Sequence, residues 1–236
     1  MSLKDQKHLV VGLGQIGSAV RTILAEKYDV TGIDAKDSVG GKFDVLHICI
    51  PGGLPDFDGI VRKYQKQYLA GGGLTVIHAT VSLGTSDRLG AVHSPVRGIH
   101  PDLVGGIKTF VKYFGGSRAD EAAKIFADLG ITTKTAAKAL DTEAGKLWDT
   151  TQYGWNIVLE KLIKKWCAEN GVDFDLVYSD FNKTYNEGYE KLGHPEYKKY
   201  ILKHHDGKIG GHCVLQNCDL MDNAITEFIK KENEGF

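Results

Sequence analysis

Three glycines near the start of the chain have the spacing of a phosphate-binding turn. Gly12, Gly14 and Gly17 form the pattern G-x-G-x-x-G, which follows the apolar run 8–11 and precedes a stretch of helical spacing that extends to about residue 28. The first glycine of such a turn permits the sharp bend, the second lets a pyrophosphate approach the backbone, and the third lets the helix pack closely on the strand. The helix N-terminus offers N–H groups and positive potential to the phosphates. The pattern predicts a dinucleotide site.

An acidic residue stands where such a site needs one. The predicted strand over 30–33 ends at Asp34, 20 residues after Gly14. A carboxylate there can hold both ribose hydroxyls and repels a 2′-phosphate, so it favours NAD over NADP, although Lys36 nearby could tolerate a phosphate. The residues expected to bind the cofactor are Gly12, Gly14, Gln15, Ile16, Gly17, Asp34, Pro51 and Thr80.

The elements that must position these residues alternate between strands and helices. Apolar runs predict strands over 8–11, 30–33, 45–50, 74–78 and 131–135. Amphipathic spacing predicts helices over 56–70 and 120–129, and the glycines 71–73 are expected to end the first of these. This rhythm predicts an α/β fold: a Rossmann-type doubly wound parallel sheet with helices on both faces, followed by a mainly α-helical C-terminal domain.

The long helix of that second domain is predicted from its ends. Asp141 or Thr142 is expected to cap a helix that runs to about Asn170, with Gly171 as its stop. A helix of roughly 30 residues is about 45 Å long and needs contacts along its length.

We therefore expect two domains with different roles. Residues 1–140 are expected to form the dinucleotide-binding domain, and residues 141–236 a helical domain for substrate and for homodimer formation through the long helix.

Composition excludes several classes of function. The 236 residues are 42% hydrophobic and 25% charged, which is typical of a folded globular protein. With 29 basic and 30 acidic residues, the charge of −1 argues against nucleic acid or an anionic membrane as the main partner. No apolar run approaches the roughly 18 residues of a membrane-spanning helix. The first residues lack a secretory signal and the four cysteines are sparse, so a cytoplasmic protein with free thiols is expected.

Short motifs, in order along the chain, resemble those of the UDP-glucose/GDP-mannose dehydrogenase family. Residues 77–85 (IHATVSLGT) resemble the family's STVPxGT loop, and Ser94-Pro95 resembles its SPE turn. Residues 114–116 (FGG) resemble its xGG stretch, and residues 142–147 (TEAGKL) resemble its TAExxKL opening of the central helix. Residues 210–213 (GGHC) resemble the GGxC loop that carries the catalytic cysteine. Prephenate and 6-phosphogluconate dehydrogenases share the N-terminal architecture.

This resemblance, which covers residues 7–220, implies an NAD-dependent oxidoreductase. A hydride would pass between the nicotinamide and a small hydroxy or carbonyl substrate. The resemblance implies that Lys146 stabilises negative charge on the reacting oxygen and that Cys213 attacks an aldehyde intermediate, with Thr80 as a further site residue. The alternative for Cys213 is a small apolar residue in a tight turn, and for Lys146 a solvated lysine.

A second group of candidates lies around the Ser-Pro turn. His100 precedes a proline, as a histidine does at the analogous place in prephenate dehydrogenases, and could act as a general base. Arg97 could bind a carboxylate or phosphate as a fork. Turn and capping roles are equally compatible with this loop, which also contains His93.

The chain departs from the family's pattern at three positions. The expected glutamate of SPE is Val96, the expected asparagine after the lysine is Thr150, and the expected aspartate after the cysteine is Asn217. The family's further domain, which grips the nucleotide of the sugar, is not expected in a chain that ends at Phe236. A nucleotide-sugar substrate is therefore not implied.

Two other functions stay open at this point. A Rossmann-like sheet also occurs in S-adenosylmethionine-dependent methyltransferases. Asp34 could bind the ribose of that cofactor equally well. The losses at Val96 and Asn217 favour a protein that binds NAD without catalysis. No metal is predicted, because the spacing of the candidate ligands lacks a C-x₂-C pair; these are His204, His205, His212, Cys213 and Cys218.

Overall fold

The computed structural model describes residues 3–98, 101–210 and 213–236, which fall into two compact units. The first unit ends at Leu147 and the second begins at Trp148. Each unit is described here by itself.

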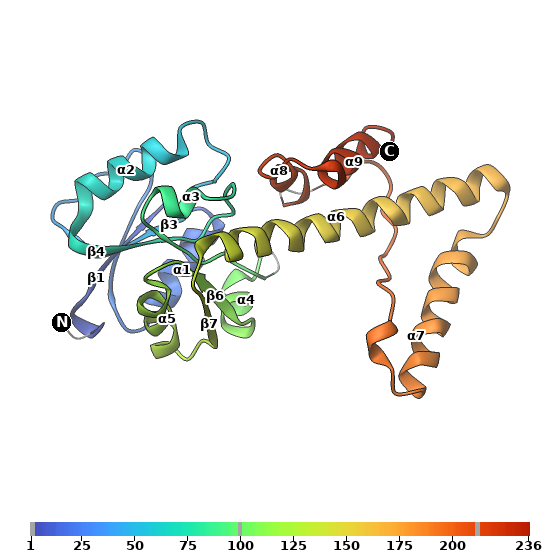
Figure 1. Cartoon of the computed structure of the whole chain (residues 1–236), viewed down its shortest axis with the longest axis horizontal. Coiled ribbons are helices and arrows are strands. Elements are labelled where there is room, and N and C mark those ends of the chain that lie inside the picture. The colour runs from blue at the N-terminus through green and yellow to red at the C-terminus, as the bar shows by residue number, and fades with distance from the viewer. Residues whose placement is uncertain (1–2, 99–100, 211–212) are drawn as a thin grey trace. The chain divides into compact units, whose positions relative to one another are not determined.

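The first unit is built on a seven-stranded sheet with the order β2-β1-β3-β4-β5-β6-β7. Figure 1 labels five of these strands. All neighbouring strands are parallel except β5 and β6, which are antiparallel. The strands are β1 (Lys7–Val11), β2 (Asp29–Ile33), β3 (Phe43–Ile48), β4 (Leu69–Ile77), β5 (Val92–His93), β6 (Lys112–Gly115) and β7 (Thr133–Ala136).

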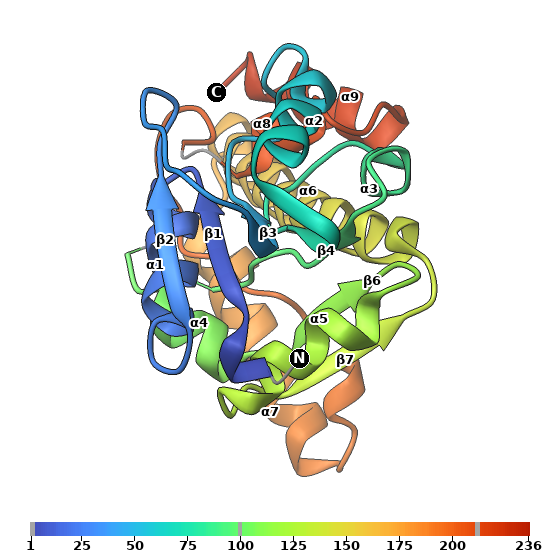
Figure 2. The ribbon, with the colours of Figure 1, turned by 90° about the vertical axis from the view of Figure 1, so that its left-hand side faces the viewer.

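Helices cover both faces of this sheet (Figure 2). They are α1 (Gln15–Leu24), α2 (Phe57–Tyr68), α3 (Thr85–Arg88), α4 (Leu103–Thr109) and α5 (Ala119–Asp128). One buried cluster joins α1, α4 and α5 to alternate strand residues such as Val10. A second joins α2 to the residues between, such as Leu9 and Val11. Because successive strand residues point to opposite faces, the two clusters share the strands. The α/β fold with helices on both faces is confirmed.

The three glycines 71–73 correct one prediction, because they do not end a helix. Helix α2 ends at Tyr68, and the glycines lie inside β4. The pairing of β3 with β4 shifts there, from Phe43↔Leu69 to Val45↔Leu74, so β4 contains extra residues. Gly72 has φ +76°, which only glycine adopts readily. The prediction failed because a bulge and a helix stop need the same residue type.

The long helix α6 (Ala139–Asn170) begins earlier than expected. Asp141 and Thr142 lie within its first turn and are not its cap, so that prediction is wrong. The Thr142 hydroxyl lies 2.9 Å from the carbonyl oxygen of Ala139, one turn back. The predicted end is confirmed, since Gly171 follows the helix with φ +65°.

The second unit is mainly helical, as predicted. Beyond α6 it contains a π-helical turn (Asp175–Asp180), α7 (Phe181–Lys191), a 3₁₀ turn (Pro195–Tyr197), α8 (Val214–Cys218) and α9 (Ala224–Asn233). Its core joins α6, α8 and α9 through Val158, Val214 and Ile229. Within the described ranges, no helix is long and apolar enough to cross a membrane.

Candidate functional site

The glycine loop connects the end of β1 to the start of α1. Gly12 has φ +90°, and a Cβ there would lie 2.9 Å from the Cγ2 of Ile50. A Cβ on Gly17 would collide with the Gly12 carbonyl oxygen, so the third glycine lets α1 pack against the turn. A Cβ on Gly14 would meet no heavy atom within 4 Å. The first and third glycines therefore fit the protein, whereas the second leaves open space for a ligand.

The start of α1 faces this open space with unused donors. Gly14 is the N-cap residue, and no side chain of the described residues caps this end. The first backbone bond of the helix runs from the Ser18 N–H to the Gly14 carbonyl at 2.9 Å. The preceding N–H groups, including those of Gln15 and Ile16, lie before the first possible intrahelical bond. A helix end of this kind binds a pyrophosphate.

Asp34 lies beside the glycine loop at the carboxyl end of β2. Its Oδ1 accepts a hydrogen bond from the Leu13 N–H at 3.0 Å, and its own N–H donates to Asp37 at 2.8 Å. The residue is exposed. The loop and the carboxylate are thus held together, as ribose recognition next to the pyrophosphate requires.

The loops after β3 and β4 form the next part of this edge. A Cβ on Gly52 would collide with the carbonyl oxygen of Thr80, so these loops are in close contact through the glycine. Pro51 is exposed and Thr80 is half-buried. The chain order reverses at β1, which lies between β2 and β3. Ligands of open α/β sheets bind at such a switch point, outside the carboxyl ends of the strands.

The first turn of α6 holds the loop that follows Thr80. Glu143 is fully buried, and its two carboxylate oxygens accept from the Gly84 N–H at 2.6 Å and from the Ser86 N–H at 2.8 Å. These N–H groups belong to the start of α3, which Glu143 therefore caps from a distant part of the chain.

A buried histidine forms a second connection between this turn and the sheet. His93 Nε2 lies 3.2 Å from the Ala79 carbonyl, and Nδ1 lies 2.9 Å from the Thr142 hydroxyl. The pKa of His93 is lowered from 6.5 to about 4, mainly by burial; the hydrogen bond to the Ala79 carbonyl opposes this, and the positive charges of Lys112 and Lys146 add to it. Lys146 therefore influences the protonation of His93, the residue that connects the end of β4, just before Thr80, to α6.

The other predicted catalytic residues are placed differently. Cys213 is exposed and belongs to the second unit, where it precedes α8. His100, predicted as a base, lies outside the described residues, as does His212.

Two positions that depart from the family's pattern contact each other in the second unit. The Asn217 side-chain amide donates to the Thr150 hydroxyl at 3.1 Å, and both residues are buried. A neutral amide–hydroxyl pair therefore stands where the motif resemblance predicts an aspartate and an asparagine.

His212, one of the candidate metal ligands, lies outside the described residues. Across 3–98, 101–210 and 213–236, no three His, Cys, Asp or Glu side chains gather as metal ligands would. His204 instead bonds Glu160 at 2.6 Å and Asp206 at 3.1 Å.

Comparisons with known proteins agree on the fold. No family model matches the sequence, and no curated protein matches it. UDP-D-ManNAc dehydrogenase from Pyrococcus horikoshii is similar in structure, with a TM-score of 0.74 and 18% identity over 97% of this chain and 68% of that chain. For UDP-N-acetyl-mannosamine dehydrogenase Cap5O from Staphylococcus aureus, the TM-score is 0.73 and the identity 19%, with the same coverage of 97% and 68%.

A shorter dehydrogenase matches over nearly its whole length. The 3-hydroxyisobutyrate dehydrogenase of Mycobacterium tuberculosis has a TM-score of 0.69 and 13% identity, over 96% of this chain and 92% of that chain. At these identities the likeness concerns the fold. The resemblance seen in the motifs is confirmed at that level: this chain has the fold shared by UDP-sugar and 3-hydroxyisobutyrate dehydrogenases.

Proposed function

We propose that the protein is an NAD-dependent oxidoreductase that transfers a hydride between nicotinamide and a small hydroxy or carbonyl substrate. The observation that carries this proposal is the open space at Gly14, at a helix end that no side chain of the described residues caps and in the loop whose Leu13 N–H donates to the Asp34 carboxylate. The three similar solved structures described above are dehydrogenases, which supports the same reaction class.

The residues of the carboxyl edge have complementary roles in this proposal. The N–H groups of Gln15 and Ile16 bind the pyrophosphate, Asp34 holds the ribose hydroxyls, and Pro51 and Thr80 line the path toward the nicotinamide. Bound NAD supplies the hydride acceptor. The carboxylate at Asp34 repels a 2′-phosphate, which selects NAD over NADP.

The catalytic roles follow the resemblance. Lys146 stabilises the negative charge that develops on the substrate oxygen when its proton leaves. Cys213 is the proposed nucleophile for an aldehyde, and its exposure at the start of α8 leaves the thiol accessible. His100 is the proposed base. The dinucleotide-binding role belongs to residues 1–140, and the substrate role to residues 141–236.

Replacing Asp34 with alanine is expected to weaken NADH binding at least tenfold. The variant loses hydrogen bonds to the ribose hydroxyls, and a hydrogen bond to a charged group contributes about 1.5–3 kcal/mol. The measurement is a fluorescence titration with NADH, with NADPH and S-adenosylmethionine as competitors. Asp29→Ala, at the other end of β2, is the matched control and should bind like the wild type. Unchanged affinity in the Asp34 variant, or displacement of NADH by S-adenosylmethionine, would contradict the proposal.

A protein that binds NAD without catalysis is the second candidate. The neutral pair of Asn217 and Thr150 favours it, because Asn217 replaces the carboxylate that the resemblance predicts after the cysteine. Lys146→Ala and Cys213→Ala separate the two candidates. A dehydrogenase activity found by a screen of hydroxy acids should fall in both variants, whereas an unchanged activity would remove these residues from the site.

We also propose a cytoplasmic homodimer formed through α6. Large apolar side chains at helical spacing are exposed along this helix: Trp148, Trp155, Leu159 and Trp166 are 45%, 40%, 45% and 54% exposed. Residues at intervals of seven and four share one face of a helix, and such a stripe matches a second copy of itself.

Trp166→Glu is expected to convert the dimer into monomers, because the charge would be buried without a partner. Light scattering after size exclusion gives the mass directly. Lys165→Glu, an exposed neighbour off the stripe, is the control and should stay dimeric. A monomeric wild-type protein would rule out this interface.

A further inference from the structure

Three buried histidines cross the central strands of the first unit in one hydrogen-bonded line. His8 Nδ1 lies 3.0 Å from His47 Nε2, and His47 Nδ1 lies 3.0 Å from His78 Nε2. His78 Nδ1 then lies 3.1 Å from the Ser94 carbonyl oxygen. All three side chains are 0% exposed, and successive rings lie in nearly parallel planes, 15° and 17° apart, with centroids 5.3 and 5.2 Å apart.

The register of the sheet makes this line diagonal. His47 pairs with Val10, two residues beyond His8 in β1, and His78 lies two residues beyond Val76, the partner of His47 in β4. Each histidine is therefore one step closer to the carboxyl ends of the parallel strands. The line runs from the amino edge of the sheet to its carboxyl edge, where the candidate cofactor site lies.

The last acceptor fixes every proton of the neutral chain. A carbonyl oxygen only accepts, so His78 Nδ1 carries a proton and His78 Nε2 accepts one from His47 Nδ1. By the same reasoning, His47 Nε2 accepts from His8 Nδ1. His8 Nε2 is left with a lone pair, and it is buried without a hydrogen-bond partner among the described residues. The chain thus has an open acceptor at one end only.

We propose that His8, His47 and His78 form a proton-transfer chain through the core of the sheet. When a proton binds His8 Nε2, the Nδ1 proton of His8 passes to His47 Nε2, and the Nδ1 proton of His47 passes to His78 Nε2. His8 and His47 end as neutral Nε2–H tautomers, and His78 ends as an imidazolium that donates to Ser94. One proton enters, and the positive charge appears at the carboxyl edge without movement of any side chain.

The charges around the outer end favour entry of a proton there. Burial lowers the pKa of His8 to about 4, while Asp44 and Asp29 raise it. The aromatic ring of Tyr28 lies beside His8, with centroids 4.8 Å apart and the ring planes tilted by 36°. The chain is therefore neutral at pH 7 and takes up its proton in acid.

The inner end shares its carbonyl with a buried lysine. Lys112 Nζ donates to the Ser94 carbonyl at 3.2 Å, and burial lowers the pKa of Lys112 to about 7, while nearby Cys49 raises it. Burial lowers the pKa values of His47 and His78 well below 6.5. The charges of His8 and Lys112 act in the same direction on His47, and those of Lys112, His47 and His93 do so on His78, which the bond to Ser94 opposes. A charge on His78 and a charge on Lys112 therefore disfavour each other.

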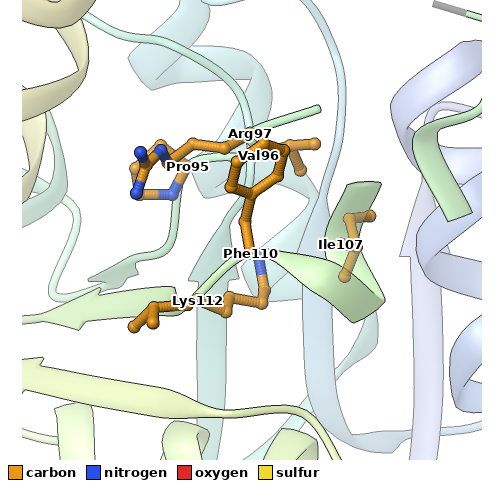
Figure 3. Close-up of a pocket in the computed structure, with 7 residues that line it drawn as sticks. Pro95, Val96, Arg97, Ile107, Phe110 and Lys112 are labelled. Atoms are coloured by element: carbon orange, nitrogen blue, oxygen red, sulfur yellow. The ribbon is translucent and has the colours of Figure 1, made fainter. Parts of the chain in front are cut away.

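The competition between the charges of His78 and Lys112 takes place next to the loop of the Ser-Pro turn. Lys112 lines a small pocket with Pro95, Val96, Arg97 and Phe110 (Figure 3). A proton that arrives at His78 changes the charge balance beneath Arg97, which the sequence marks as a candidate for anion binding. The proton-transfer chain itself does not depend on the proposed dehydrogenase activity.

Nitrogen NMR of the wild-type protein with ¹⁵N-labelled histidine tests the chain directly. At neutral pH we expect Nδ1–H tautomers for His8, His47 and His78, with couplings across both His–His hydrogen bonds. On acidification, over the pH range in which circular dichroism shows that the protein is still folded, His8 and His47 should become Nε2–H tautomers as His78 gains its second proton. The exposed His194 and His205 serve as internal controls. Nε2–H tautomers at neutral pH, or independent titration of the three rings without these couplings, would overturn the proposal.

Lys112→Met provides a second test that leaves all three histidines in place. Removal of the competing charge should raise the pH at which His78 becomes an imidazolium, whereas Lys124→Met, an exposed lysine on α5, should leave it unchanged. His47→Leu should uncouple His8 from His78. An unshifted titration of His78 in the Lys112 variant would contradict the competition between His78 and Lys112 at the Ser94 carbonyl. This result does not depend on whether the His47 variant folds.

Discussion

Replacing Gly14 with alanine is expected to weaken NADH binding severely while the protein keeps its fold. Gly14 has φ −64°, which alanine adopts without strain, and a Cβ there meets no protein atom within 4 Å. The methyl group instead occupies the space that the pyrophosphate needs. We expect the affinity for NADH to fall at least about 100-fold, or about 2.8 kcal/mol. A fluorescence titration gives the affinity, and thermal unfolding gives the stability.

Gly17→Ala is the contrasting control on the same loop. Its Cβ would collide with the carbonyl oxygen of Gly12, so this variant should lose roughly 1–3 kcal/mol of stability before any effect on binding is measured. The two variants therefore distinguish a glycine that leaves room for the ligand from a glycine that the packing of the protein requires. Wild-type NADH affinity in the Gly14 variant would mean that the cofactor does not occupy this loop.

Acid is expected to unfold the protein well above the range in which most carboxylates titrate. Burial lowers the pKa values of His8 and His93 from 6.5 to about 4, and those of His47 and His78 also fall well below 6.5. Between pH 6.5 and 4 the unfolded chain binds these protons and the folded protein does not. Stability is therefore fully present above pH 6.5 and is lost as the pH falls toward 4.

The size of this effect follows from the two shifts that have values. Each fall of about 2.5 pKa units corresponds to roughly 3 kcal/mol, so His8 and His93 together remove a large part of an ordinary domain's stability. Urea unfolding at pH 7, 6 and 5 measures the loss. A stability that stays constant from pH 7 to pH 5 would show that these histidines are not buried in the neutral form.

Lys112 extends the dependence of stability on pH into the alkaline range. Its pKa falls from 10.5 to about 7 because of burial, so stability should rise further as the pH is raised from 7 to 10.5. Lys112→Met should accordingly be more stable than the wild type at pH 7, because the hydrophobic replacement carries no charge into the core.

The part of the fold that local patterns encode was predictable. The strand, the glycine turn, the helix and Asp34 follow each other within 35 residues, and each has a local signature. The short elements α3, β5, α4 and β6 were not predicted. The two residues of β5 are too few to show an alternating pattern, and their conformation depends on neighbouring strands.

The buried contacts between distant residues could not be predicted for a different reason. Glu143 reads as a helix-surface residue, and only the docking of α6 shows that it caps α3. The line of His8, His47 and His78 depends on the strand order and on the register of two strand pairs. A histidine that alternates with apolar residues in a strand was the available signal, but it does not identify the neighbouring ring.

The cap provided by Glu143 also has a consequence for the order of folding. Helix α3 has four residues, and the carboxylate that satisfies its N–H groups lies 59 and 57 positions further along the chain. A single isolated turn is not stable, and contacts between residues far apart in sequence close a long loop at an entropic cost. During synthesis, the loop that carries Thr80 therefore cannot reach its final form when its own residues leave the ribosome. It must wait until the first turn of α6 has emerged, so the edge that holds the candidate cofactor site is completed late in translation of the first unit.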